Sequence, residues 1–122
     1  MIEKELDYIL DAFHPEKFRK EGHALVDLLA DYLKKLEERH EDIEVLPHFS
    51  PNEAFSHWES ELENPGTKSL TDLFSKVLNE GIHLHHPGYI GHQINPPAPS
   101  AALGSLLNAF MNNGMAVFEM GV

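Results

Sequence analysis

The chain has 122 residues, enough for one domain with a modest core, and its 20 acidic and 9 basic residues give a net charge of −11. Nucleic acids and anionic membrane surfaces attract clustered cations, so neither is expected as a partner. The absence of cysteine excludes disulfides and thiolate chemistry. With no apolar signal segment and no run able to span a bilayer, we expect a cytoplasmic protein.

The charge is unevenly distributed along the chain. Residues 1–63 carry a net charge of −10, whereas residues 81–118 contain no Asp, Glu, Lys or Arg. A small free-standing domain normally solvates its whole surface with charges. We therefore expect this 38-residue stretch to be covered by protein that is not part of the chain.

Two helices are expected in the N-terminal part. Residues 2–13 carry apolar side chains at helical spacing, and His14-Pro15 ends this helix because the residue before proline is pushed out of the α region. Residues 18–36 form the second helix, whose apolar seam should bury against another helix of this chain or of a partner. The seam is Phe18, Gly22, Leu25, Leu29, Tyr32 and Leu36, at spacings of four and three.

Two more helices carry start signals of their own. Ser50-Pro51-Asn52-Glu53 combines an N-cap serine, proline at the first helical position and glutamate at the third, which is a capping box. Ser69 and Asp72 open the next helix, and Gly81 is its expected end.

The last part of the chain consists of a loop and a helix. Proline and glycine are frequent in residues 82–99, which predicts an ordered loop. Ser100 is expected to cap a final apolar helix that stops near Gly114. The fold class is therefore all-α, with four to five amphipathic helices and one Pro/Gly-rich loop.

Three sets of residues are candidates for chemistry. The histidines are ligand types for Zn²⁺, but hydrogen bonding within a crowded loop is favoured and no metal site is expected. The acidic groups, such as Glu59, Glu61 and Glu63, are expected to lie on exposed faces and only to solvate the chain. No nucleophile elbow, phosphate-binding loop or dinucleotide fingerprint is present, so no catalytic residues are assigned. The histidines are His83, His85, His86 and His92.

The third candidate is the segment 85–96 itself, which presents neutral polar side chains on a backbone stiffened by proline. Such groups suit the wall of a small-molecule pocket. They equally suit an ordered connector whose polar groups satisfy its own backbone. The pattern leaves both interpretations open.

From about Phe18 to Val122 the sequence resembles the N-terminal portion of the group II pyridoxal-phosphate-dependent decarboxylases, a family that includes aromatic amino acid, histidine and glutamate decarboxylases. The densest similarity is the His-Pro-x-Tyr/Phe loop, followed by the helix after it. The matching pieces are Phe18-Arg19-Lys20-Glu21-Gly22-His23, Val45-Leu46-Pro47 with Pro51, His86-Pro87-Gly88-Tyr89, residues 100–113 and Phe118-Glu119.

The resemblance implies that the loop after His-Pro lines the substrate side of an active site. It places His92, Gln93, Ile94 and Asn95 beside the bound amino acid, with Gln93 at the position of a glutamine that meets the substrate in glutamate decarboxylases. Aromatic decarboxylases have aromatic side chains at His92 and Gln93, so this departure argues against a large aromatic substrate and towards a polar or acidic one. Phe118 matches an aromatic pocket-wall residue that approaches the partner subunit's site.

The resemblance also implies what residues 1–122 are: a helical dimerisation segment of a decarboxylase (a carboxy-lyase) without its cofactor domain. The complete enzyme would use pyridoxal 5'-phosphate on an amino acid substrate as a homodimer or higher oligomer. The family's Schiff-base lysine is absent, so this chain alone is expected to bind no cofactor and to be inactive. The alternative is an autonomous helical dimerisation or scaffold module without catalysis.

Overall fold

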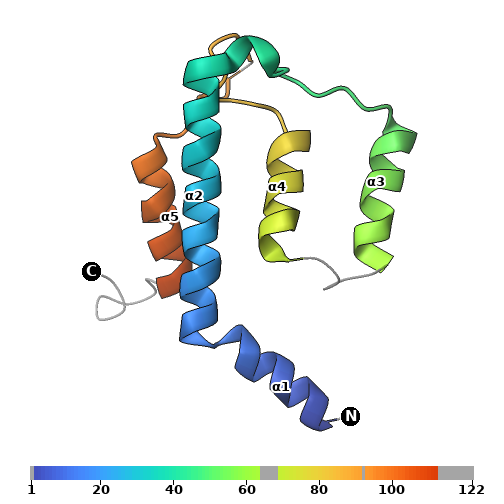
Figure 1. The fold of residues 1–122 in the computed structure, drawn as a ribbon, viewed down its shortest axis with the longest axis vertical. Helices are drawn as coiled ribbons and strands as arrows, with labels where there is room; N and C mark the ends of the chain where they lie inside the picture. Colours follow the sequence, from blue (N-terminus) through green and yellow to red (C-terminus); the bar gives the residue numbers. More distant parts are fainter. Residues whose placement is uncertain (1, 64–68, 92, 113–122) are drawn as a thin grey trace. The chain divides into compact units, whose positions relative to one another are not determined.

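The computed structural model describes residues 2–63, 69–91 and 93–112. These residues form α-helices, one short 3₁₀ helix and loops, which confirms the predicted all-α class (Figure 1). The chain divides into two compact units, Met1–Ile90 and Gly91–Val122. The helices are α1 (Ile2–Ala12), α2 (Pro15–Arg39), the 3₁₀ helix η1 (His40–Asp42), α3 (Pro51–Glu63), α4 (Leu70–Glu80) and α5 (Pro99–Met111).

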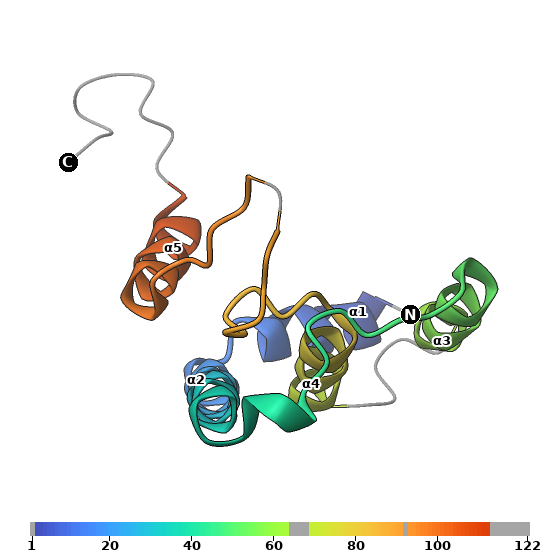
Figure 2. The same cartoon turned by 90° about the horizontal axis from the view of Figure 1, so that it is seen from above.

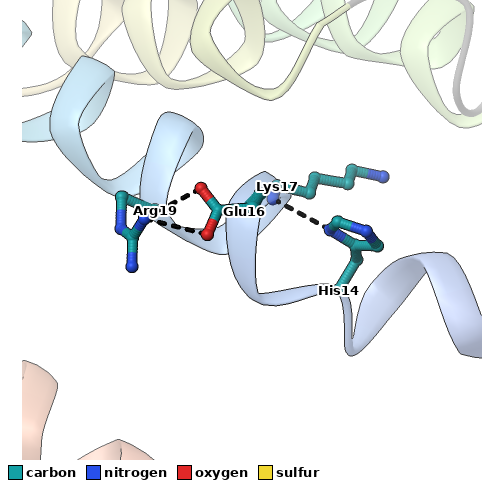
Figure 3. A network of polar contacts seen from close by, with 4 residues as sticks. All are labelled: His14, Glu16, Lys17 and Arg19. Carbon is teal, nitrogen blue, oxygen red and sulfur yellow. Dashed lines mark hydrogen bonds and ion pairs between the residues drawn. The ribbon is translucent and has the colours of Figure 1, made fainter.

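The corner between α1 and α2 forms where the sequence predicts it. His14 is extended, with ψ of 117°, and Pro15 occupies the first turn of α2, where its missing N–H is not needed. The imidazole of His14 accepts a hydrogen bond from the Lys17 N–H at 3.4 Å and so caps α2 (Figure 3). Arg19 binds both carboxylate oxygens of Glu16 at 2.8 Å on the same turn. The helix therefore begins three residues before the predicted seam.

The first unit has a small core between α2 and α4, which pack side by side (Figures 1 and 2). Leu36 is 3% exposed and is the one buried apolar residue among the described residues. Leu25 and Tyr32 of the predicted seam are half-buried, whereas Phe18 and Leu29 are exposed. The seam thus packs within this chain mainly through its C-terminal half.

The start signals of α3 and α4 act as predicted. Ser50 N–H donates to the Glu53 carboxylate at 2.8 Å, and Glu53 N–H donates back to the Ser50 hydroxyl at 3.4 Å. Ser69 and Asp72 form the same reciprocal pair at α4, with 3.1 Å from the Asp72 N–H to the Ser69 hydroxyl. Each pair satisfies N–H groups that a helix end leaves without an intrahelical acceptor.

In the second unit, α5 begins differently from the prediction. The N-cap is Ala98 and Pro99 is the first helical residue, so Ser100 lies inside the helix and is not its cap. Proline is suited to this position because its φ is already helical. The helix ends at Met111, and Asn112 closes it in the left-handed conformation with φ of 44°. Gly114, the predicted stop, lies outside the described residues.

The apolar side chains of α5 are solvent-exposed. None of the helix's residues is charged, and every residue from Pro99 to Met111 is exposed. Among the described helices, none combines the length and apolar character needed to cross a bilayer. The exposed large side chains are Leu103, Leu106, Leu107, Phe110 and Met111.

Candidate functional site

Two consecutive turns shape the loop that follows α4. The His86 N–H donates to the His83 carbonyl at 3.0 Å, and the Tyr89 N–H donates to the His86 carbonyl at 2.9 Å. His86 therefore ends the first turn and begins the second. Pro87 and Gly88 occupy the two central positions of the second turn, where these residue types are common.

The imidazole of His86 uses both of its nitrogens. Nε2 lies 2.7 Å from the His40 carbonyl oxygen at the start of η1, and Nδ1 accepts a hydrogen bond from the Gly88 N–H at 2.9 Å. A carbonyl can only accept, so Nε2 carries the proton and Nδ1 keeps its lone pair. This arrangement assigns one neutral tautomer to His86.

His83 anchors the other end of the loop. The residue is 7% exposed, its ring Nε2 lies 3.1 Å from the Leu78 carbonyl, and its backbone N–H donates to the Val45 carbonyl at 2.9 Å. The ring meets Tyr32 edge to face at 5.4 Å between centroids, and burial raises the pKa of Tyr32 above its ordinary value. Because Nε2 donates to Leu78, Nδ1 is the acceptor atom, and it is buried without a hydrogen-bond partner.

Hydrogen bonds engage Nε2 of His83 and both nitrogens of His86, two of the histidines weighed as metal ligands. His83 and His86 direct Nε2 toward backbone carbonyls, and His85 is half-buried. Among the described residues, no group of three or more His, Asp or Glu side chains is arranged to hold a metal ion. His92 lies outside the described residues.

The predicted substrate-binding residues belong to the second unit. Gln93, Ile94 and Asn95 are exposed and precede α5, and Gln93 has a left-handed backbone with φ of 60°. Such a φ is uncommon for a residue with a side chain, and it turns the backbone sharply at this position. His92 and Phe118 lie outside the described residues.

A second polar cluster, which the sequence analysis did not find, joins α3 to α4. The Lys76 ammonium lies 3.1 Å from the Glu61 carboxylate and 4.7 Å from the centroid of the Trp58 ring, and it also donates to the His57 carbonyl. Glu61 has a side-chain exposure of 12%, so the expectation that it only solvates an exposed face is wrong. Lys76 stands 15 positions from Glu61 and 18 from Trp58, and nothing in the local pattern links it to these two residues of α3.

A face of α3 next to this cluster is open to solvent. Phe55 and Leu62 are 66% and 79% exposed and line a shallow depression together with Trp58. The carboxylates of Glu59 and Glu63 border it. The spacing of three and four residues places all five side chains on one face of the helix.

Taken together, the fold and the loop define an all-α segment with an anchored Pro/Gly-rich loop and two apolar helix faces in solvent. A 97-residue match to tyrosine decarboxylase 2 of Arabidopsis thaliana, at 34% identity, covers 77% of this chain and 18% of that protein. Tyrosine decarboxylase 4 of Petroselinum crispum is 28% identical over 84% of this chain and 20% of its own length. A phenylacetaldehyde synthase of Petunia hybrida is 29% identical over 80% of the chain and 19% of its own length.

These matches confirm the resemblance drawn from the sequence: the chain is homologous to the group II pyridoxal-phosphate-dependent decarboxylases. It spans about one fifth of the length of the curated relatives that it matches. No family model matches the chain, and no solved structure matches it significantly.

The described residues do not fit pyridoxal phosphate. The cofactor is held as a Schiff base by a lysine that is free to react. The Lys76 ammonium is engaged by Glu61 and Trp58, and the Lys17 ammonium is paired with Asp11. Lys20, Lys34 and Lys35 lie on the exposed surface of α2. No reaction step is therefore assigned to the described part of this chain.

Proposed function

We propose that residues 1–122 are the N-terminal helical segment of a pyridoxal-phosphate-dependent amino acid decarboxylase, a carboxy-lyase that works in the cytoplasm as a homodimer. The observation that carries this proposal is the similarity to plant tyrosine decarboxylases over about four fifths of the chain. In the complete enzyme the cofactor and its lysine belong to a further domain. The segment described here contributes a subunit interface and one wall of the substrate pocket.

The proposed interface is supported by the exposed apolar face of α5. Leu103, Leu107 and Phe110 are 55%, 63% and 71% exposed and follow one another at spacings of four and three. A contiguous apolar surface without charge is typical of a face that binds other protein. The open face of α3 is a second exposed apolar surface, but it is bordered by the carboxylates of Glu59 and Glu63.

The proposed pocket wall is supported by the chemistry of the segment before α5. Gln93 and Asn95 carry neutral amides that donate and accept hydrogen bonds, and they flank an apolar Ile94. The polar residues favour a polar substrate, whereas the relatives are named for tyrosine and for an aromatic aldehyde. The substrate proposed here is a phenolic amino acid, which joins an aromatic ring to a hydroxyl group, and this proposal replaces the expectation that a large aromatic substrate is disfavoured.

A chimera tests the proposal directly. Residues 1–122 replace the matching segment of the Arabidopsis tyrosine decarboxylase 2, and release of CO₂ from tyrosine is measured together with the mass of the complex. We expect an active dimer. A folded dimer with bound cofactor and no activity would contradict the pocket-wall role, and a well-folded monomer would contradict the interface role. If the free chain dimerises while the chimera stays inactive, the scaffold alternative is favoured.

Gln93 provides a matched test within that chimera. Replacing Gln93→Ala should raise KM for tyrosine or lower kcat, because the substrate hydroxyl loses the hydrogen bond that the Gln93 amide is proposed to make with it. The effect should be about 5- to 50-fold in kcat/KM, the range expected for losing one to two neutral hydrogen bonds. The control is His23→Ala on the exposed surface of α2. Unchanged kinetics for Gln93→Ala would remove this residue from the site.

A further inference from the structure

We infer that His86 is a positioning residue: its neutral imidazole clamps onto η1 the His83–Tyr89 loop, from which the chain continues toward the segment 93–95. The clamp is read from contacts within the first unit. Its consequence for catalysis rests on the proposed function, in which residues 93–95 form part of the substrate-pocket wall.

The geometry of the clamp joins parts of the chain that are far apart in sequence. The bond from Nε2 to the His40 carbonyl spans 46 residues and is partly buried. The bond from the Gly88 N–H to Nδ1 spans two residues and fixes the second turn from inside. One side chain thus ties the turn to itself and to η1, and it does so only in the tautomer that carries its proton on Nε2.

The packing around Gly88 shows that the ring position is constrained. A Cβ atom added at Gly88 would lie 3.1 Å from His86 Nδ1 and 3.2 Å from Cε1, with Val45 Cγ2 at 3.6 Å. The imidazole therefore packs closely against the backbone of Gly88, and a side chain at position 88 requires the ring to shift by a few tenths of an ångström. The His40 ring meets the His86 ring edge to face, at 6.0 Å between centroids.

Other residues of the loop reinforce its anchoring without replacing the clamp. His83 holds the loop's first residue to Leu78 and Val45, upstream of the second turn. Beyond His86, the backbone bond from Tyr89 to the His86 carbonyl closes the turn but reaches no other element. Among the hydrogen bonds described for this second turn, only the Nε2 bond of His86 reaches η1, where the His86 ring also meets the His40 ring.

Substitutions can separate the two bonds. Asn places an amide oxygen near the position of Nδ1, so His86→Asn should keep the bond from Gly88 and lose the one to His40. Gln reaches further and places an amide N–H near Nε2, so His86→Gln should keep the bond to His40 and lose the one from Gly88. His86→Ala loses both. The exposed His23, changed to Asn, Gln or Ala, is the matched control.

The first test uses the full chain and needs no activity. Imidazole ¹⁵N NMR should show His86 as the neutral Nε2–H tautomer. Exchange of the Gly88 amide should be about fivefold faster in His86→Ala and His86→Gln, the factor expected from one net hydrogen bond, and near wild type in His86→Asn. Gly88→Ala should also perturb the His86 ring resonances without removing the imidazole. The clamp is refuted if Gly88 exchange is unchanged in His86→Ala or if the proton is found on Nδ1.

The second test uses the active chimera described above. His86→Ala should raise KM for tyrosine several-fold more than it lowers kcat, and Asn and Gln should each restore part of the loss. An active chimera whose KM does not respond to His86→Ala would overturn the positioning role while leaving the proposed function intact. A chimera that is inactive with His86 in place would instead count against the proposed function, and the exchange test would still decide whether the clamp exists.

Discussion

At the scale of single residues, Glu53 couples the start of α3 to pH. Hydrogen bonds from the hydroxyl and then the backbone N–H of Ser50 lower the pKa of Glu53 below its ordinary value of 4.5. The folded state therefore favours the ionised carboxylate. This contribution to stability is complete above the ordinary pKa and is lost as the pH falls through the lowered one.

We predict that acidification to below about pH 4 frays the first turn of α3, since protonated Glu53 no longer accepts these bonds as an anion. The ¹³Cα shifts of residues 51–54 report this change. The variant Glu53→Gln should start from a weaker cap and respond less to acid, whereas Glu59→Gln, at an exposed position further along α3, should respond as the wild type does. Equal acid responses in Glu53→Gln and the wild type would contradict the prediction.

At the same scale, the contacts that could be predicted from the sequence are those between residues close together in the chain. The capping pairs Ser50–Glu53 and Ser69–Asp72 were readable because each spans three residues. The cap of α5 was misread, because Ser100 is a common cap residue but Pro99 already stands at the first helical position. A helix start was correctly predicted here, but the predicted N-cap, Ser100, lies two residues after the observed one, Ala98.

At the scale of elements, the contact between α3 and α4 depends on Lys76. Replacing Lys76→Met keeps most of the hydrocarbon stem and removes the charge that Glu61 and Trp58 share. We predict a loss of about 1 kcal/mol in the free energy of unfolding, since the pair is partly buried and the ring adds a cation–π term.

A double-mutant cycle with Glu61→Gln should give a coupling of about 0.5–1 kcal/mol. Trp58 is the single tryptophan of the chain, so its fluorescence emission reports directly on the contact with Lys76. Lys34→Met, on the exposed surface of α2, is the matched control. A coupling near zero would show that the cluster does not hold the two helices together.

The contact between α2 and α4 depends on Leu36. The substitution Leu36→Ala should lower the free energy of unfolding by about 2–3 kcal/mol, because Leu36 is 3% exposed and the change removes buried, well-packed methyl groups. Leu29→Ala, at a seam position that is 38% exposed, should cost less than half as much. Urea unfolding followed by circular dichroism measures both. Equal losses would mean that the seam packs uniformly and that Leu36 is not the centre of this core.

At the scale of the whole molecule, the apolar face of α5 should drive association of the free chain. We predict an oligomer in light scattering, and a shift to monomer when Leu107→Glu and Phe110→Glu are combined, because two charges on this face oppose its burial. Ser105→Glu adds charge on the opposite side of the helix and should leave the oligomer intact. A wild-type chain that is strictly monomeric would contradict the interface proposal.

The candidate site shows how far the sequence alone reaches. An ordered loop over residues 82–99 was expected from its prolines and glycines, Pro87 and Gly88 among them, and the histidines were expected to hydrogen-bond within it. Which atoms they bond to was not predictable, since the partner of His86 Nε2 is a backbone carbonyl 46 residues away. The roles of Gln93, Ile94 and Asn95 stay predictions that the chimera tests.

The sequence by itself determined the helices, their starts and the uneven charge, because these follow from spacings of three to four residues and from side chains that bond to nearby backbone. Only the tertiary structure decided that Leu36 is the buried member of the seam, that Lys76 lies over Trp58, and that His86 holds η1. Such contacts depend on where whole helices meet. Many side chains of the same type could meet there, and the choice among them is made by packing and not by local pattern.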